Sequence, residues 1–133
     1  MRSNNQRAIK GPDAEQASYY YSEPQLATQG SLTLQGKRFE VQGMAWLDHE
    51  WSTSVLDASA SGWYWVGANL DDGSALMAFQ IRAKDGSSLW RHATLRLANG
   101  QVSQFAADDV RFTPQRQWRS PHTGASYPVA MQV

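Results

Sequence analysis

The chain has 133 residues, with twelve basic and twelve acidic side chains and no cysteine. That length favours a single domain with one core. The balanced charge, with a pI near 6.8, argues against a partner such as nucleic acid or an anionic membrane surface. Without cysteine there is no disulfide framework and no thiolate metal site. No apolar run reaches the roughly 20 residues of a membrane span.

Residues 1–18 are polar and are interrupted by Gly11-Pro12. We expect them to form an N-terminal extension with at most a short helix, followed by one β domain over residues 19–133. The first residues lack the apolar core of a signal peptide, so the cytoplasm is the default location.

From residue 19 onward the pattern is that of short strands separated by turn residues. Tyr19-Tyr20-Tyr21-Ser22 is an edge-strand candidate that Pro24 would limit, because proline cannot donate a ladder hydrogen bond. Gln35-Gly36, residues 71–74 and residues 84–87 are hairpin turn candidates. The expected strands cover residues 31–34, 37–42, 46–52, 62–70, 75–82, 89–97, 101–105, 109–113 and 127–133, with a loop at 53–61.

Turn signals about every 8–12 residues are typical of an antiparallel sandwich or barrel. The last strand pattern runs to Val133. An unpaired strand edge promotes association, so we expect the sheet to be completed by a second copy in a homodimer, or the chain to be a portion of a longer protein.

The stretch from Trp46 to Trp51 stands out, because it holds two tryptophans, two carboxylates and a histidine. In an extended strand, side chains alternate between the two faces. Trp46, Asp48 and Glu50 would then point one way, and Leu47, His49 and Trp51 the other. An aromatic and an ionisable group on both faces suit a wall between a ligand site and a second packed layer.

Several motifs occur in an order that resembles a known family. They are Lys10-Gly11, residues 17–22 (Ala-Ser-Tyr-Tyr-Tyr-Ser), residues 43–52 (Gly-Met-Ala-Trp-Leu-Asp-His-Glu-Trp-Ser), residues 62–65 (Gly-Trp-Tyr-Trp), residues 70–73 (Leu-Asp-Asp-Gly), Leu76-Met77, Arg82, Trp118, Ser120-Pro121, Gly124 and Tyr127-Pro128. Together they resemble the AttH-like and carotenoid hydratase family, often labelled predicted secreted hydrolases, whose members have lipocalin-like β-barrel domains. The resemblance covers residues 10–133 and implies an antiparallel lipocalin-like β-barrel or half-barrel, truncated relative to the family. Family members are often exported, which leaves the location open.

The resemblance also implies candidate catalytic residues. In the hydratase branch, a His and a Trp of an Asp-His-x-Trp motif are linked to activity, and they correspond to His49 and Trp51. The family often has Asp where this chain has Tyr64. Adding water to an isolated double bond needs a proton donor, for which Asp48 or His49 would serve, and a positioned water, which Glu50 would hold. The indole faces of Trp51, Trp63 or Trp65 would stabilise the developing cation.

Three functions stay open. The first is binding of a small apolar ligand, with His49 and Asp48 as polar anchors, because such sites are mostly apolar with a few polar groups. The lining residues would be Trp51, Trp63, Trp65, Tyr64, Met77 and Phe79. The second is a hydratase, or a related isomerase or cyclase, acting on an isoprenoid-like substrate. The third is a non-catalytic structural or self-assembling fragment.

The third function follows from purely structural roles for the same residues. Trp46 and Trp63 would be core residues, and His49 a structural histidine. Asp48 and Glu50 would cap a turn or pair with Arg38, Arg82 or Arg91. No metal is expected, because His49, His92 and His122 are scattered, and no motif indicates a cofactor.

Overall fold

The computed structural model describes residues 6–9, 17–52 and 56–133. These residues form nine strands and one short 3₁₀ helix. The elements are β1 (Gln6–Ile9), β2 (Ala17–Leu34), β3 (Lys37–Trp51), β4 (Ala60–Asn69), β5 (Ala75–Ala83), β6 (Ser88–Arg96), β7 (Val102–Phe105), η1 (Ala107–Asp109), β8 (Thr113–Arg119) and β9 (Ser126–Gln132).

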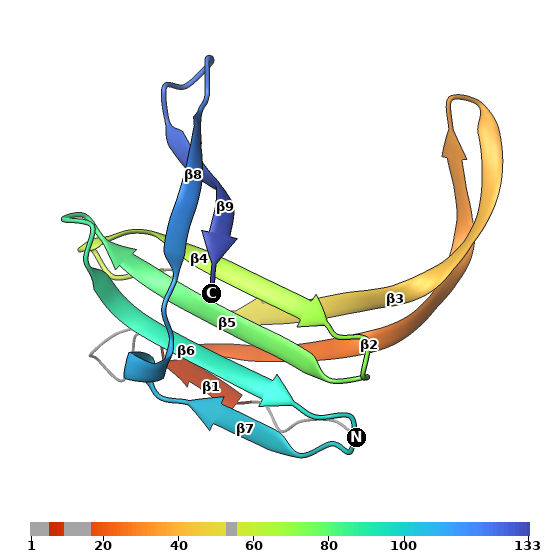
Figure 1. Cartoon of the computed structure of the whole chain (residues 1–133), viewed down its shortest axis with the longest axis horizontal. Coiled ribbons are helices and arrows are strands. Elements are labelled where there is room, and N and C mark those ends of the chain that lie inside the picture. The colour runs from red at the N-terminus through yellow and green to blue at the C-terminus, as the bar shows by residue number, and fades with distance from the viewer. Residues whose placement is uncertain (1–5, 10–16, 53–55) are drawn as a thin grey trace.

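The strands form three antiparallel sheets, with strand orders β1-β2-β3, β4-β5-β6-β7 and β8-β9. The β2–β3 hairpin curves away from the body of the molecule and the β8–β9 hairpin projects from it (Figure 1). The all-β antiparallel prediction is confirmed. In the described residues the sheets do not close into a barrel, so the half-barrel form of the prediction is the one observed.

The β2–β3 hairpin is much longer than expected. Gln35 and Gly36 both have positive φ, 51° and 76°, which is the geometry of a two-residue hairpin turn whose twist matches the strands. Beyond the predicted arms, pairing continues as far as Tyr19 opposite Trp51. Pro24 does not end β2, because a register shift between Glu23 and Leu26 accommodates it.

The predicted turns at residues 71–74 and 84–87 are confirmed. Asp72 Oδ1 accepts a hydrogen bond of 2.8 Å from the Ser74 backbone N–H and one from the Ser74 hydroxyl, and Asp85 Oδ1 accepts one of 2.9 Å from the Ser87 N–H. Hydrogen bonds from the serine side chain and then its N–H lower the pKa of Asp72, and the same causes act on Asp85. These turns bring β4, β5 and β6 into register.

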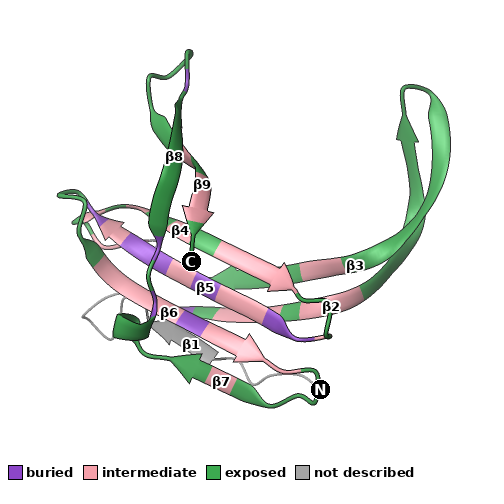
Figure 2. Ribbon diagram, viewed as in Figure 1, coloured by how far each residue is buried: buried purple, intermediate pink, exposed green. Residues whose placement is uncertain are grey.

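The buried core lies on one face of the β4–β7 sheet, which we call the outer face. Ala78 and Ala93 from the sheet pack with Val110 and Phe112, and Tyr64, Val66 and Met131 pack against this cluster. The rings of Tyr64 and Phe112 stack with their centroids 6.0 Å apart. The Arg82 guanidinium lies 4.6 Å from the centroid of the Tyr64 ring. Most buried residues lie in the body of the molecule, Ala75 and Ile81 on the other face of the sheet among them, whereas both projecting hairpins are largely exposed apart from Ser120 in the β8–β9 turn (Figure 2).

Two expectations about the elements are wrong. Residues 6–9 do not form a helix or a loose lead, because they pair with residues 17–20 as strand β1; residues 1–5 and 10–16 lie outside the described residues. The expected strand at 109–113 is absent, and this segment is the end of η1 and a connection. Val110 and Phe112 alternate as in a strand because both are buried on the core, but their backbone pairs with no neighbouring strand.

The β4–β7 sheet meets the β1–β3 sheet through its other face, which we call the inner face. The indoles of Trp46 and Trp65 pack edge to face, with centroids 6.0 Å apart. Nearby, Asn69 Oδ1 accepts from the Gln25 backbone N–H at 2.9 Å, and Asn69 Nδ2 donates to the Ala45 carbonyl at 3.3 Å. These contacts fix β2 and β3 against the end of β4.

Candidate functional site

The two faces of β3 carry different groups, as its alternation predicts. Trp46 and Asp48 lie on the side that meets the β4–β7 sheet, and Glu50 shares their face of the strand. His49 and Trp51 lie on the opposite side, which is exposed. The motif is therefore divided between two surfaces.

A hydrogen-bonded network surrounds Asp48. Its Oδ1 accepts from Trp46 Nε1 at 2.6 Å and from Ser22 Oγ at 2.6 Å. Ser22 Oγ also lies 2.8 Å from the Tyr20 hydroxyl. A serine hydroxyl has a single proton, so Ser22 shares it between Asp48 Oδ1 and the Tyr20 hydroxyl oxygen. Ser22 thus links Tyr20 and Asp48 in one hydrogen-bonded network.

Burial raises the pKa of Tyr20 to about 12, and hydrogen bonding to and charge on Asp48 act in the same direction. Hydrogen bonds from Ser22 and Trp65 oppose the rise. Tyr20 is therefore neutral at physiological pH and available as a donor. Through Trp65, the network on the β1–β3 sheet is joined to the inner face of the β4–β7 sheet.

Glu50 continues this surface along β3. Ser18 Oγ donates to Glu50 Oε1 at 2.5 Å, and Ser18 is buried, with 1% of its surface exposed. The carboxylate is thus held by a neighbouring strand.

The inner face of the β4–β7 sheet carries aromatic rings in register. Trp65 on β4 lies opposite Phe79 on β5, which lies opposite His92 on β6. The neighbouring rows are Trp63, Ile81 and Trp90 on one side, and Gly67, Met77 and Thr94 on the other. Cross-strand partners point to the same face, so these residues form one continuous, mostly apolar surface.

His92 adds a polar group to this surface. Its ring centroid is 6.0 Å from that of Phe79, and its Nε2 is 3.1 Å from Thr94 Oγ1. Burial lowers the pKa of His92, so its ring is neutral at pH 7. A neutral imidazole offers one N–H donor and one acceptor.

A second cluster lies on the exposed side of β2 and β3. The Tyr19 ring stacks on Trp51 at 5.5 Å, and His49 contacts Trp51 edge to face at 5.0 Å. Tyr21 Oη is 3.3 Å from His49 Nδ1. Tyr19 and Trp51 remain 50% and 41% exposed, so the cluster is accessible.

The predicted site residues therefore do not share one surface. Trp63, Trp65, Met77 and Phe79 lie on the inner face, where Asp48 faces them; Glu50 is on the Asp48 side of β3. His49 and Trp51 belong to the exposed cluster, and Tyr64 belongs to the buried core on the outer face.

The exposure of two tryptophans can be compared with their expected role as core residues. Trp63 is 57% exposed, so its expected role as a core residue is wrong. Trp46 is half-buried, in contact with Trp65.

Some residues of these surfaces were not singled out from the sequence. The turn at residues 84–87 fixes the register of β5 and β6 and places His92 opposite Phe79 and Thr94 opposite Met77. The sequence therefore contains enough information to put His92 and Thr94 on this face. Tyr20 and Ser22 were hidden, because Pro24 suggested that the strand ends there. Their contact with Asp48 depends on the pairing of β2 with β3 beyond Pro24.

Among the described residues, no group of three or more His, Cys, Asp or Glu side chains is arranged to hold a metal ion. No helix of residues 6–9, 17–52 and 56–133 is both long and apolar enough to span a membrane.

The fold and the divided motif define a class of all-β proteins with open, lipocalin-like sheets. The AttH-like family model matches residues 2–133, so the chain belongs to the AttH-like family. It is similar to the crystal structure of a protein assigned to AttH from Nitrosomonas europaea, at 55% identity and a TM-score of 0.91. A match at 22% identity, with a TM-score of 0.64, is kievitone hydratase from Nectria haematococca, which shows likeness of fold.

The chain spans less than half of these relatives. It is covered over 98% of its length by the Nitrosomonas protein but accounts for 41% of that chain. For kievitone hydratase the shares are 86% of this chain and 36% of that one. No curated protein matches the chain.

Proposed function

We propose that this domain binds a small apolar ligand against the inner face of the β4–β7 sheet. The observation that carries the proposal is the in-register row of Trp65, Phe79 and His92 facing the side of β3 that bears Trp46. Binding sites for small molecules are mostly aromatic and aliphatic with few polar groups, and this surface has that composition.

Exposure of the tryptophans supports the same proposal. Trp63 and Trp65 are 57% and 43% exposed, although both lie on a face that also carries Phe79 and Met77. Covering such rings is favourable by about 25 cal/mol per Å² of apolar surface. A flat or elongated apolar molecule would bury them, and Asp48 with its Ser22 and Tyr20 partners would supply a polar contact.

The test is binding of N-phenyl-1-naphthylamine, a neutral fluorescent apolar probe. We expect Trp65→Ala and Phe79→Ala each to weaken binding about tenfold, because each removes roughly 1.5–3 kcal/mol of apolar contact. Trp118→Ala on β8 is the matched control, since Trp118 is also exposed, at 50%, but lies on another sheet. Equal effects of all three substitutions, or no binding, would refute the proposal.

A second candidate function is hydration of an isoprenoid-like alkene at the exposed cluster. It is favoured by the contacts of His49 with Tyr21 and Trp51. Protonated His49 would give its proton to one alkene carbon, and the indole of Trp51 would stabilise the cation at the other. Water would add there and return a proton to the imidazole. Kievitone hydratase, which has a similar fold, is a hydratase, but at 22% identity it supports the fold alone.

Turnover and binding separate the two functions. Under the hydratase hypothesis, His49→Ala abolishes incorporation of ¹⁸O from labelled water into an isoprenoid alkene but leaves probe binding at wild-type strength. If His49→Ala retains turnover, the hydratase hypothesis is wrong. If it unfolds the protein, by circular dichroism, His49 is structural.

The β2–β3 hairpin supports a proposal about the partner. Leu32, Leu34, Phe39 and Val41 share one side of the hairpin and are 52%, 59%, 39% and 46% exposed. An apolar stripe of this kind is typical of an interface. We propose that a second copy of the chain covers it, and that Phe39→Ser shifts the molecular mass measured by light scattering from dimer to monomer. A wild-type monomer at micromolar concentration would contradict this.

A further inference from the structure

A row of polar side chains runs along β6 beside the aromatic surface. His92, Thr94 and Arg96 alternate with residues of the outer face, so all three belong to the inner face. Their β5 neighbours are Phe79, Met77 and Ala75 in the same order. The surface thus has an apolar part on β4 and β5 and a polar border on β6.

Arg96 is the unusual member of this row. Its Nε is buried and has no hydrogen-bond partner among the described residues, a property shared by Arg82 Nε on the outer face. Within the part of the chain that the structure describes, no carboxylate lies within ion-pair distance of the Arg96 guanidinium. Buried donors in folded proteins are nearly always satisfied, so an unsatisfied guanidinium beside the aromatic surface is available to an acceptor that a ligand brings.

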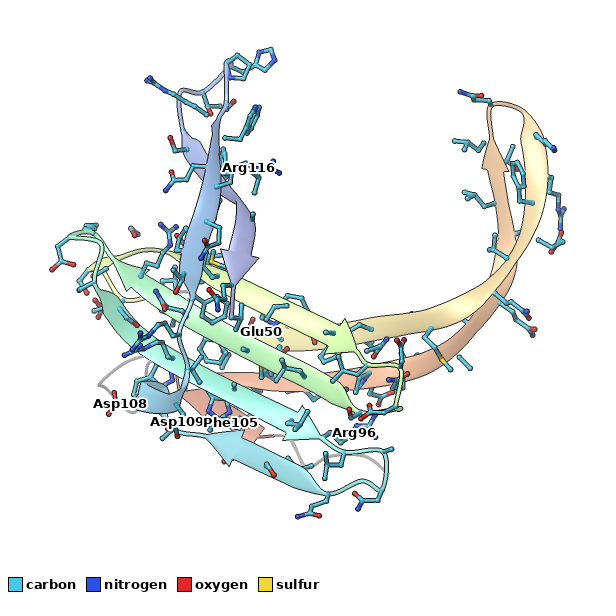
Figure 3. All side chains as sticks on the ribbon, viewed as in Figure 1. Glu50, Arg96, Phe105, Asp108, Asp109 and Arg116 are labelled. Carbon is cyan, nitrogen blue, oxygen red and sulfur yellow. The ribbon has the colours of Figure 1, made fainter. Side chains whose placement is uncertain are left out.

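The charges on the two sheets are separated along the strands. Arg96 is in register with Ala75, which is in register with Asn69 at the end of β4. Asn69 donates to Ala45, and β3 leads from there through Asp48 to Glu50, toward the other end of β4. Figure 3 shows both residues in the body of the molecule, Glu50 on β3 and Arg96 near the end of β6. Asp71 and Asp72 lie in the turn that joins Asn69 to Ala75, but among the described residues neither forms an ion pair with Arg96.

We propose that Arg96, with Thr94 and His92 beside it, binds the carboxylate of an amphipathic acid whose apolar chain lies on Met77, Phe79 and Trp65. The inference rests on the proposed ligand-binding function and adds to it the chemical class of the ligand. A guanidinium matches a carboxylate through two parallel N–H···O bonds. Thr94 and His92, which are 3.1 Å apart, supply hydroxyl and N–H groups along the same strand.

The experiment compares decanoate with decan-1-ol, which share a chain length and differ in the charge of the head group. Each displaces N-phenyl-1-naphthylamine, and the readout is the ratio of the two dissociation constants. Wild type is expected to prefer decanoate. Arg96→Gln should reduce that preference at least about tenfold, because charge-assisted hydrogen bonds are worth roughly 1.5–3 kcal/mol. Arg116→Gln, an exposed arginine on β8, is the control and should leave the ratio unchanged.

The outcomes separate this inference from the proposed function. If Trp65→Ala weakens displacement by both compounds but Arg96→Gln leaves the ratio at the wild-type value, the anion site is wrong and the apolar site stands. If neither compound displaces the probe, both fail. Arg96→Lys keeps the positive charge but lacks the planar guanidinium, so its preference for decanoate should lie between those of wild type and Arg96→Gln. If Arg96→Gln does not fold, Arg96→Lys tests the anion site in its place.

Discussion

Trp46 and Trp65 meet edge to face, at an interplanar angle of 80°, and this contact joins the β1–β3 sheet to the β4–β7 sheet. Gly67 completes it, because a Cβ atom there would lie 2.5 Å from Trp65 Cη2 and 3.0 Å from Trp46 Cε2. The absence of a side chain at residue 67 thus allows the two indoles to approach. The contact positions the Asp48 network against the aromatic row.

Gly67→Ala is expected to destabilise the protein by about 1–3 kcal/mol, because the added methyl group overpacks two rigid rings. Urea unfolding followed by circular dichroism measures the change. Gly30→Ala on β2 is the control, since a Cβ there meets nothing within 4 Å. A Gly67→Ala variant as stable as the Gly30→Ala variant would show that the two indoles do not pack in this way.

Tyr20 should lose its proton at an unusually high pH. Because burial raises the pKa of Tyr20 to about 12, its ionisation, followed by absorbance at 295 nm, should occur well above the ordinary range. A raised pKa means that the associated stability is present below the unfolded value and is lost as pH rises through about 12.

Tyr20→Phe should remove that late phase from the titration, and Tyr127→Phe should not, because Tyr127 is 49% exposed on β9. Persistence of the late phase in Tyr20→Phe would place the buried phenol elsewhere.

The pH dependence of stability should contain a contribution from His92. Burial lowers its pKa in the folded state below the ordinary 6.5, so below that pH the unfolded chain binds the proton more readily. The contribution of His92 to the free energy of unfolding is therefore complete above about pH 6.5 and is lost as pH falls through the folded-state pKa of His92.

Urea unfolding of wild type and His92→Gln at pH 7.5 and 5.0 measures this contribution. His92→Gln should show a smaller loss between the two pH values than wild type, whereas His122→Gln, at an exposed turn, should match wild type. An unchanged loss in His92→Gln would mean that His92 is not desolvated.

Asn69 should contribute to the junction of the sheets through its two hydrogen bonds, one to β2 and one to β3. Asn69→Ala leaves both backbone partners without the side-chain amide, so we expect a loss of about 1–3 kcal/mol in the free energy of unfolding. Gln42→Ala, on the exposed part of β3, should change it little. Equal effects of the two substitutions would argue against the junction.

Local signals in the sequence were sufficient for the hairpins and for the faces of β3. Turn residues such as Asp72-Gly73 and Gln35-Gly36 define register, and alternation follows from the strand itself. They also place Trp65 and Phe79 on one face. What alternation does not specify is which face of one sheet packs on which face of another. That choice depends on long-range contacts such as Trp46 with Trp65, which turn the Asp48 side of β3, and not the His49 side, toward the aromatic row.

Two misassigned segments have similar physical causes. The bulge near Pro24 lets β2 continue where proline was expected to end it, so the pairing of Tyr20 and Ser22 with β3 was missed. Val110 and Phe112 alternate because they are buried, yet burial without a hydrogen-bonded neighbour does not make a strand.

The most direct test of the account is the effect of N-phenyl-1-naphthylamine on the indole N–H signals in ¹H–¹⁵N spectra, with the six tryptophans assigned by single substitution. Binding at the inner face predicts that the signals of Trp63 and Trp65 shift with a common dissociation constant, while that of Trp118 stays in place. Shifts confined to Trp51 would instead locate binding at the exposed His49 cluster, and would contradict the central claim.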